Sequence, residues 1–292
     1  MSEYQHCEFV AVDRPLGGRA RAELRDLDTA ARVTPAGLVH SGGSGEFRAD
    51  PAALMEWYFD ACVCLGSTGA RQVMLRLPQR LLGVALARRY CVADAASAWA
   101  AGDNVIVSLS CDAGDPAPGE AEGRLVSIAG ARPELAAGDL RLLYLGWLLC
   151  VQAGQAGSGH AEPPVPPGLC ALSPAQGEVA AFLGLDEDLL AVAAEGSGAG
   201  PGLGARLPGW VSGLPEAEKD ALLLRAARGE GAQVQAFLQG QYRAQHPAPW
   251  DGAAPRTAGD LRDGTVRRRE ARERLAASRK EAGLTRHRRP DR

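Results

Sequence analysis

The stretch AGDLRLLYLGWLLCVQ, from Ala137 to Gln152, decides how this chain is organised. Asp139 is a favourable N-cap residue, and the positions from Leu140 to Val151 are apolar nearly all the way round a helix. A helix of this kind must be enclosed on most sides, by protein or by lipid. At about 14 residues it reaches only about 21 Å, whereas a bilayer needs roughly 20 residues. The sequence therefore predicts a buried central helix in a folded domain.

The residues before this helix carry signals for both strands and helices. Apolar and alternating runs predict strands at Tyr4–Asp13, Ala61–Leu65, Gln72–Leu77 and Val105–Leu109, and an extended segment at Ala31–His40. Helices are expected over Arg19–Leu27, from the Asp50-Pro51 start through Phe59, and near Arg80–Tyr90. In the Gln72–Leu77 strand, the alternation predicts Val73, Leu75 and Leu77 inward, with Arg71 and Arg76 outward.

The residues after the central helix predict a different organisation. A Pro/Gly-rich linker or strap over 154–170 is followed by the capping box Ser173-Pro174-Ala175-Gln176, which opens a helix to about Leu183. Helices are also expected at Asp186–Glu195, Pro215–Arg228 and Ala232–Arg243.

Together these signals predict an α+β protein. Its N-terminal mixed α/β domain (1–153) has a small sheet and the buried helix, followed by the linker (154–170), a small all-α domain (171–244) and a charged tail (245–292) that is basic and largely disordered or a single helix.

Charge is distributed unevenly along the chain. Residues 256–292 contain 13 Arg and Lys against 6 Asp and Glu, a net charge of +7, which leaves −10 for residues 1–255. Lys219 and Lys280 are the only lysines. Chemistry that depends on lysine, such as a Schiff base or a phosphate-binding loop, therefore has almost no residue to use.

Two glycine-rich segments invite a functional interpretation. The loop Gly42–Gly45 with His40, Ser41 and Ser44 lacks the Gly-x-Ser-x-Gly pattern of a nucleophile elbow, so we expect a surface loop. The segment Gly200–Ala205 resembles a dinucleotide fingerprint, but it follows a helix and contains a proline, so we expect a linker. No cofactor-binding motif is identified.

The chain has seven cysteines and no pattern of disulfide pairing; they are Cys7, Cys62, Cys64, Cys91, Cys111, Cys150 and Cys170. Cys62 and Cys64 would share one face of a strand and, with His6-Cys7, allow a zinc site in principle. Structural zinc sites usually show two close ligand pairs, and only one is present. We therefore expect most of the cysteines to be reduced and buried, and no metal to be bound.

The basic tail is the segment best suited to an external partner. Its candidate phosphate-binding residues are Arg267, Arg268, Arg269 and Arg272. Charges at i and i+4, such as Glu270 with Arg274, favour a solvated or partner-contacting helix instead, and no aromatic residue is available for base stacking. The tail is expected to break at Gly264 and Gly283.

The order of several segments resembles a family of bacterial proteins with no assigned function. The matching pieces include the opening Met1–Gln5 with Glu8-Phe9, Asp13–Leu16, Leu54–Glu56, Tyr58–Ala61, Leu75–Pro78, the Gly138–Gln152 helix, Glu162–Leu169 and Pro215–Arg225. The resemblance covers most of residues 1–244 and implies no activity, cofactor or catalytic residue.

The leading functional hypothesis is a non-catalytic, cytoplasmic bacterial protein that binds another protein or acts as a scaffold. Trp57 and Trp210 are the candidate partner-binding residues. The first alternative is an enzyme whose site is built from scattered Arg, Asp and Glu in the α+β domain. The second is nucleic-acid binding through the tail. No segment predicts insertion into a membrane.

Overall fold

The computed structural model describes residues 4–41, 47, 49–114, 119–197, 209–231, 234, 237–238, 241–242 and 256–287. The strands are β1 (Tyr4–Val10), β2 (Arg32–Val33), β3 (Gly37–His40), β4 (Ala61–Gly66), β5 (Ala70–Pro78), β6 (Ala96–Ala101) and β7 (Asn104–Asp112). The helices in the first part of the chain are α1 (Gly18–Leu27), α2 (Pro51–Trp57), α3 (Val84–Arg88), α4 (Arg124–Ile128), α5 (Ala131–Ala136) and α6 (Arg141–Gln152). They are followed by α7 (Pro174–Phe182), α8 (Glu187–Glu195), α10 (Glu216–Arg225), the π-helical turn η2 (Ala226–Glu230) and α12 (Ala258–His287).

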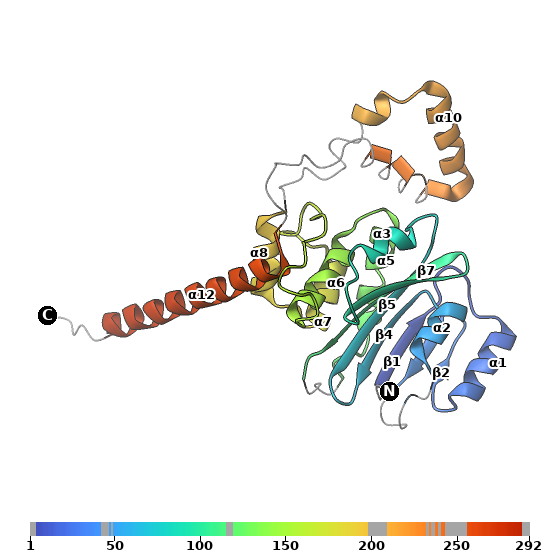
Figure 1. Ribbon diagram of the computed structural model, residues 1–292. Helices are drawn as coiled ribbons and strands as arrows, with labels where there is room; N and C mark the ends of the chain where they lie inside the picture. Colours follow the sequence, from blue (N-terminus) through green and yellow to red (C-terminus); the bar gives the residue numbers. More distant parts are fainter. Residues whose placement is uncertain are drawn as a thin grey trace.

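The strands form one antiparallel sheet in the order β2-β3-β1-β4-β5-β7-β6, so the predicted α+β class is confirmed (Figure 1). Helices cover both faces of the sheet. On one face of the sheet, a smaller hydrophobic core around Phe9, Met55 and Phe59 is covered by α1 and α2. On the other face, which we call the large face, helices α3 to α8 cover a larger hydrophobic core. Every second residue of the central strands points into this core, as Val73 and Leu75 do in β5.

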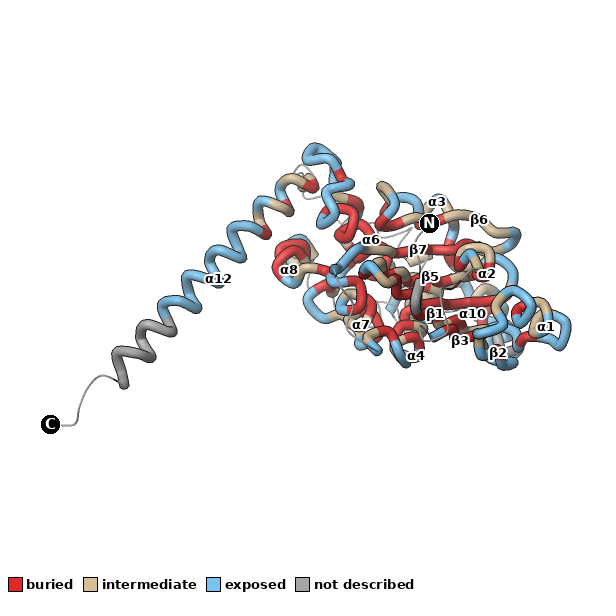
Figure 2. Tube along the Cα trace, turned by 90° about the horizontal axis from the view of Figure 1, so that it is seen from below, coloured by how far each residue is buried: buried red, intermediate tan, exposed pale blue. Residues whose placement is uncertain are grey.

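Helix α6 is the centre of the larger core. Ten consecutive residues, Leu142 to Val151, are buried, which confirms the prediction of a buried central helix (Figure 2). Gly146 lets α6 approach the sheet closely, because a Cβ atom there would lie 2.5 Å from Leu109 Cδ2. Asp139 is not the N-cap residue, since Leu140 occupies that position. The Asp139 carboxylate instead accepts hydrogen bonds from the backbone and side chain of Arg141.

The proline-rich segment 154–170 is packed onto the body as a strap. Tyr90 Oη donates a hydrogen bond of 2.9 Å to the carbonyl oxygen of Pro164, and Leu169 is buried in the larger core. Helices α7 and α8 lie beyond the strap, and their apolar residues belong to the same core as the sheet. The capping box at Ser173 is confirmed, and Asp186 caps α8. The domain limits at 153 and 170 stay a prediction.

Helix α12 is continuous, so the predicted breaks at Gly264 and Gly283 are wrong. Gly264 is a point of close approach, because a Cβ atom there would lie 2.8 Å from Val192 Cγ1 of α8. The first turns of α12 lie against α8, and the rest of the helix projects away from the body (Figures 1 and 2). None of the helices described here is both long enough and apolar enough to span a membrane.

The predicted outward orientation is wrong for Arg71 and holds for Arg76. Arg71 lies two residues before Val73 and so shares its inward face, where it is buried and pairs with Glu120 at 2.9 Å. Arg76 is on the opposite face, but its guanidinium is held by Asp60 at 2.9 Å. The alanine-rich strand β6 and the short helices α4 and α5 were not predicted from the sequence.

Candidate interaction surface

Asp60, just before β4, joins three chain segments at one end of the sheet. Its carboxylate accepts hydrogen bonds from the backbone N–H groups of Val12 and Asp13 at 2.7 and 2.8 Å. Arg76 of β5 donates to the other carboxylate oxygen from Nε and Nη2, at 3.2 and 2.9 Å. The segment after β1, the start of β4 and the end of β5 are thereby tied to one side chain.

Arg132 of α5 closes this cluster from the other side of the sheet. Its Nη2 lies 2.6 Å from Asp13 and 3.8 Å from Asp60, and its Nε donates to the carbonyl oxygen of Arg76 at 2.7 Å. We call Asp13, Asp60, Arg76 and Arg132 the Asp60 cluster. It contains two carboxylates and two guanidinium groups, so the charges balance within it.

Trp57 is the last residue of α2 and precedes Asp60 by three positions in the chain. Helix α2 begins where the sequence predicts, with the Asp50 side chain accepting from the Ala52 N–H and Pro51 in the first position, but it ends at Trp57 rather than Phe59. Its end is held by Glu56, whose carbonyl oxygen accepts from Arg76 and whose carboxylate accepts from Trp99 Nε1 at 2.8 Å.

The Trp57 side chain is 77% exposed although the helix that carries it is fixed at both ends. Val12, whose backbone binds Asp60, is also exposed. A shallow depression lined by Gln79, Arg80 and Asp103 lies where β5 ends and β6 turns into β7. This end of the sheet therefore exposes a tryptophan and a valine whose backbone segments are held by hydrogen bonds to Asp60 and Glu56.

The chemistry available to the Asp60 cluster is limited by its own hydrogen bonds. Asp60 is 1% exposed, and its two oxygens already accept four N–H groups. A carboxylate offers about four lone-pair directions, so these bonds use its accepting capacity. Asp60 can thus hold the surface in shape, but it cannot contact a molecule bound outside.

The candidate phosphate-binding arginines of the tail are largely engaged within the protein. Arg272 lies 2.9 Å from Asp188, Arg268 lies 3.6 Å from the same carboxylate, and Arg269 pairs with Asp186. Arg267 is exposed. The acids Asp186 and Asp188 at the start of α8 thus bind α12.

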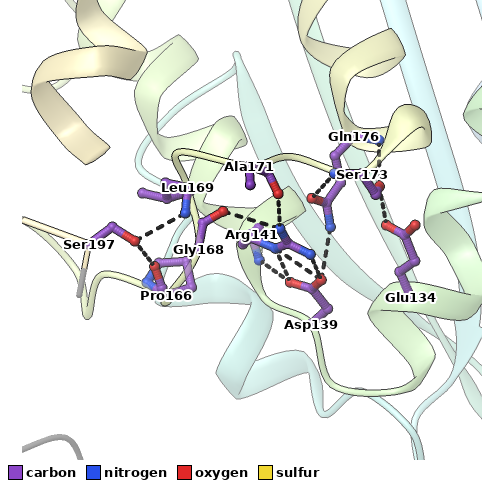
Figure 3. Close-up of polar contacts among 10 residues, drawn as sticks. All are labelled: Glu134, Asp139, Arg141, Pro166, Gly168, Leu169, Ala171, Ser173, Gln176 and Ser197. Carbon is purple, nitrogen blue, oxygen red and sulfur yellow. Dashed lines mark hydrogen bonds and ion pairs between the residues drawn. The ribbon is translucent and has the colours of Figure 1, made fainter. Parts of the chain in front are cut away.

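A third polar cluster lies where the strap meets α6 and α7 (Figure 3). Arg141 donates to the carbonyl oxygens of Gly168 and Ala171 at 3.2 and 2.8 Å while it pairs with Asp139. Gln176 Nε2 donates to Asp139, at 3.0 Å. Burial alone would raise the pKa of Asp139, but the hydrogen bonds from Arg141 outweigh it and lower that pKa. The cluster fixes the strap to the two helices.

The cysteine pair lies where the sequence predicts, on one face of β4. Cys62 and Cys64 are buried, and Cys7 is the direct cross-strand neighbour of Cys64. Burial raises the pKa of both β4 thiols well above the usual value. Within the described ranges, no group of three or more His, Cys, Asp or Glu side chains is arranged to hold a metal ion.

The remaining candidates are placed as follows. His40 is buried against Phe47, with its Nδ1 2.7 Å from Asp28, and Ser41 is exposed. The Trp210 ring is half-buried and meets Tyr242 edge-on at 5.7 Å. Ser44, the Gly42–Gly45 loop and the Gly200–Ala205 segment lie outside the described residues.

Comparisons with protein-family models, curated proteins and solved structures gave no match.

Trp57 was predicted from the sequence as a candidate residue, but the residues that hold its surroundings in place were not. Asp60 reaches Val12 across 48 positions of the chain, and Arg132 reaches Asp13 across 119. One sequence signal was available, because Asp60 stands alone as an acid between the apolar residues Phe59 and Ala61 of a predicted core region. A charge in that position requires a partner.

Proposed function

We propose that this chain is a non-catalytic, cytoplasmic bacterial protein whose α+β domain binds another protein through the surface around Trp57. The supporting observation is a 77% exposed tryptophan at the end of α2, a helix whose start is capped by Asp50 and whose end is held by Arg76 and Trp99 through Glu56. Tryptophan is enriched among the residues that dominate binding energy at protein interfaces, and a helix end that is already held in place loses little backbone entropy on binding.

The arrangement of charges agrees with this proposal better than with either alternative. An enzyme built on the Asp60 cluster would need an acid or base that reaches its substrate, and Asp60 is buried and fully hydrogen-bonded. Nucleic-acid binding through the tail would compete with the pairs that Arg269 and Arg272 make to α8.

A capture experiment with purified full-length protein as bait tests the proposal. The wild type, Trp57→Ala and Val126→Ala are compared by quantitative mass spectrometry of retained proteins, and the main candidate is then purified and titrated against all three. Val126 is the matched control, since it is 83% exposed on α4, a helix of the other sheet face. We expect Trp57→Ala to weaken the interaction by about 2 kcal/mol or more, roughly 30-fold, and Val126→Ala to leave it unchanged.

The proposal is wrong if Trp57→Ala retains the same partner with unchanged affinity, or if no protein is retained above background by the wild type. Retention of nucleic acid alone, lost at moderate salt, would support the second alternative instead.

A further inference from the structure

Helix α12 is attached to the body at two places of different character. The first is Arg256, just before the helix, whose Nε and Nη2 each donate to Glu162 of the strap at 2.8 Å. The same guanidinium donates to the carbonyl oxygens of Val192 and Ala193 near the end of α8. Tyr144 of the central helix donates its hydroxyl hydrogen to Glu162. We call this group the Arg256 anchor.

The Arg256 anchor is sheltered from solvent. The Glu162 side chain is 4% exposed, and Tyr144 is buried in the core. Ala258 and Leu261, in the first turns of α12, are fully buried beside it. Ion pairs in such surroundings are screened only weakly by dissolved salt.

The second attachment lies further along α12, and its arginine side chains are partly open to solvent. Arg268, Arg269 and Arg272 are each about half exposed, and they converge on Asp186 and Asp188 at the start of α8. We call this group the arginine latch. Thr265 is the last buried residue of α12 before the latch, and Val266 is already half exposed. The latch therefore joins half-exposed arginines to acids that are more covered, because the side chains of Asp188 and Asp186 are 6% and 25% exposed.

We propose that the arginine latch is a salt-sensitive conformational device that sets the direction of α12, while the Arg256 anchor keeps the base of the helix on the body. In the latched state Gly264 lies on Val192 and α12 projects along a fixed line (Figures 1 and 2). When the latch charges are screened, the projecting part of α12 moves about the anchor and uncovers the acidic start of α8. This inference is independent of the role of Trp57.

Pairs of spin labels measure the direction of α12 in the full-length protein. Labels are attached through a genetically encoded keto side chain at Ala276 of α12 and Ala100 of β6, both exposed. Distances are recorded at about 0.01 M and about 1 M salt, which shortens the screening length from about 30 Å to about 3 Å. We expect one narrow distance distribution at low salt and a distribution at least twice as broad at high salt.

Variants separate the latch from general effects of salt. Asp188→Asn and the triple variant R268Q/R269Q/R272Q should be broad already at low salt. The triple variant changes only half-exposed side chains, so it tests the latch even if Asp188→Asn does not fold. Glu270→Gln is the control, because Glu270 pairs with Arg274 on α12 itself; it should match the wild type. The proposal is overturned if the triple variant stays narrow at low salt, or if the wild type is equally broad at both salt concentrations.

Discussion

At the scale of single residues, a close approach of the central helix to the sheet depends on the absence of a side chain at Gly146. In Gly146→Ala the new Cβ would lie 2.5 Å from Leu109 Cδ2 and 3.2 Å from Ala96 Cβ. We expect a loss of about 1–3 kcal/mol of stability from overpacking, despite the better helix propensity of alanine. Urea denaturation measures this loss.

Gly177 of α7 is the matched control for Gly146. It is also helical, but an added Cβ atom would meet no atom within 4 Å. Gly177→Ala should therefore stabilise the protein by up to about 1 kcal/mol, through helix propensity alone. If both substitutions changed the free energy of unfolding equally, Leu109 and Ala96 would have to move aside for the new Cβ atom at little cost, which would contradict the prediction.

The residue scale also marks the limit of prediction from sequence. Local signals placed Asp50 and Ser173 correctly as caps, because a cap is defined by its immediate neighbours. The partners of Asp60 and of the tail arginines come from distant segments, so no local pattern contains them. Arg71 was misplaced for a simpler reason, since a strand residue two positions from Val73 shares its face.

At the scale of elements, the start of α6 should respond to pH through Asp139. Its folded pKa is lowered by Arg141, so its contribution to stability is present above the unfolded pKa of about 3.9 and is lost as pH falls through the lowered value. Asp139→Asn should therefore be less stable than the wild type at neutral pH, with the difference shrinking below about pH 4.

Urea denaturation at neutral pH and at about pH 2.5 tests this pH dependence. Asp263→Asn removes an exposed aspartate of α12 and should leave the stability nearly unchanged at both pH values. A difference for Asp139→Asn that stays constant with pH would contradict the assignment to ionisation of Asp139.

Elements were predicted well where their periodicity was strong. The buried helix and the strands β4, β5 and β7 have continuous or alternating apolar patterns, and their limits shift by a few residues at most. Strand β6 was missed because its alanines have low strand propensity, and it forms through pairing with β7. Helix α12 continues through Gly264 because packing on Val192 favours a residue without a side chain there.

At the scale of the whole molecule, one guanidinium links the strap, α8 and α12. Arg256→Ala would leave the Glu162 carboxylate, 4% exposed, without its charged partner. Removing one member of a buried pair typically costs about 3–5 kcal/mol, so we expect a loss near the lower end of that range. Thermal or chemical denaturation of the full-length variant measures it.

Arg274→Ala is the control for Arg256→Ala. Its side chain is 79% exposed and pairs with Glu270 one turn away, so the substitution should lower the free energy of unfolding by about 1 kcal/mol or less. If both substitutions had the same small effect, the strap would be held by its apolar contacts rather than by the Arg256 anchor.

The order of the chain along the sheet also matters while the protein is being made. In the part of the chain that the structure describes, every strand lies between Tyr4 and Asp112, whereas α6, which covers the large apolar face, ends at Gln152. At translation rates of about 5–20 residues per second, the intervening 40 or so residues take roughly 2–8 s to appear. During that interval a nascent sheet has an apolar face without its central helix, so the growing chain is most exposed to aggregation, and most in need of a chaperone, just before its central helix emerges.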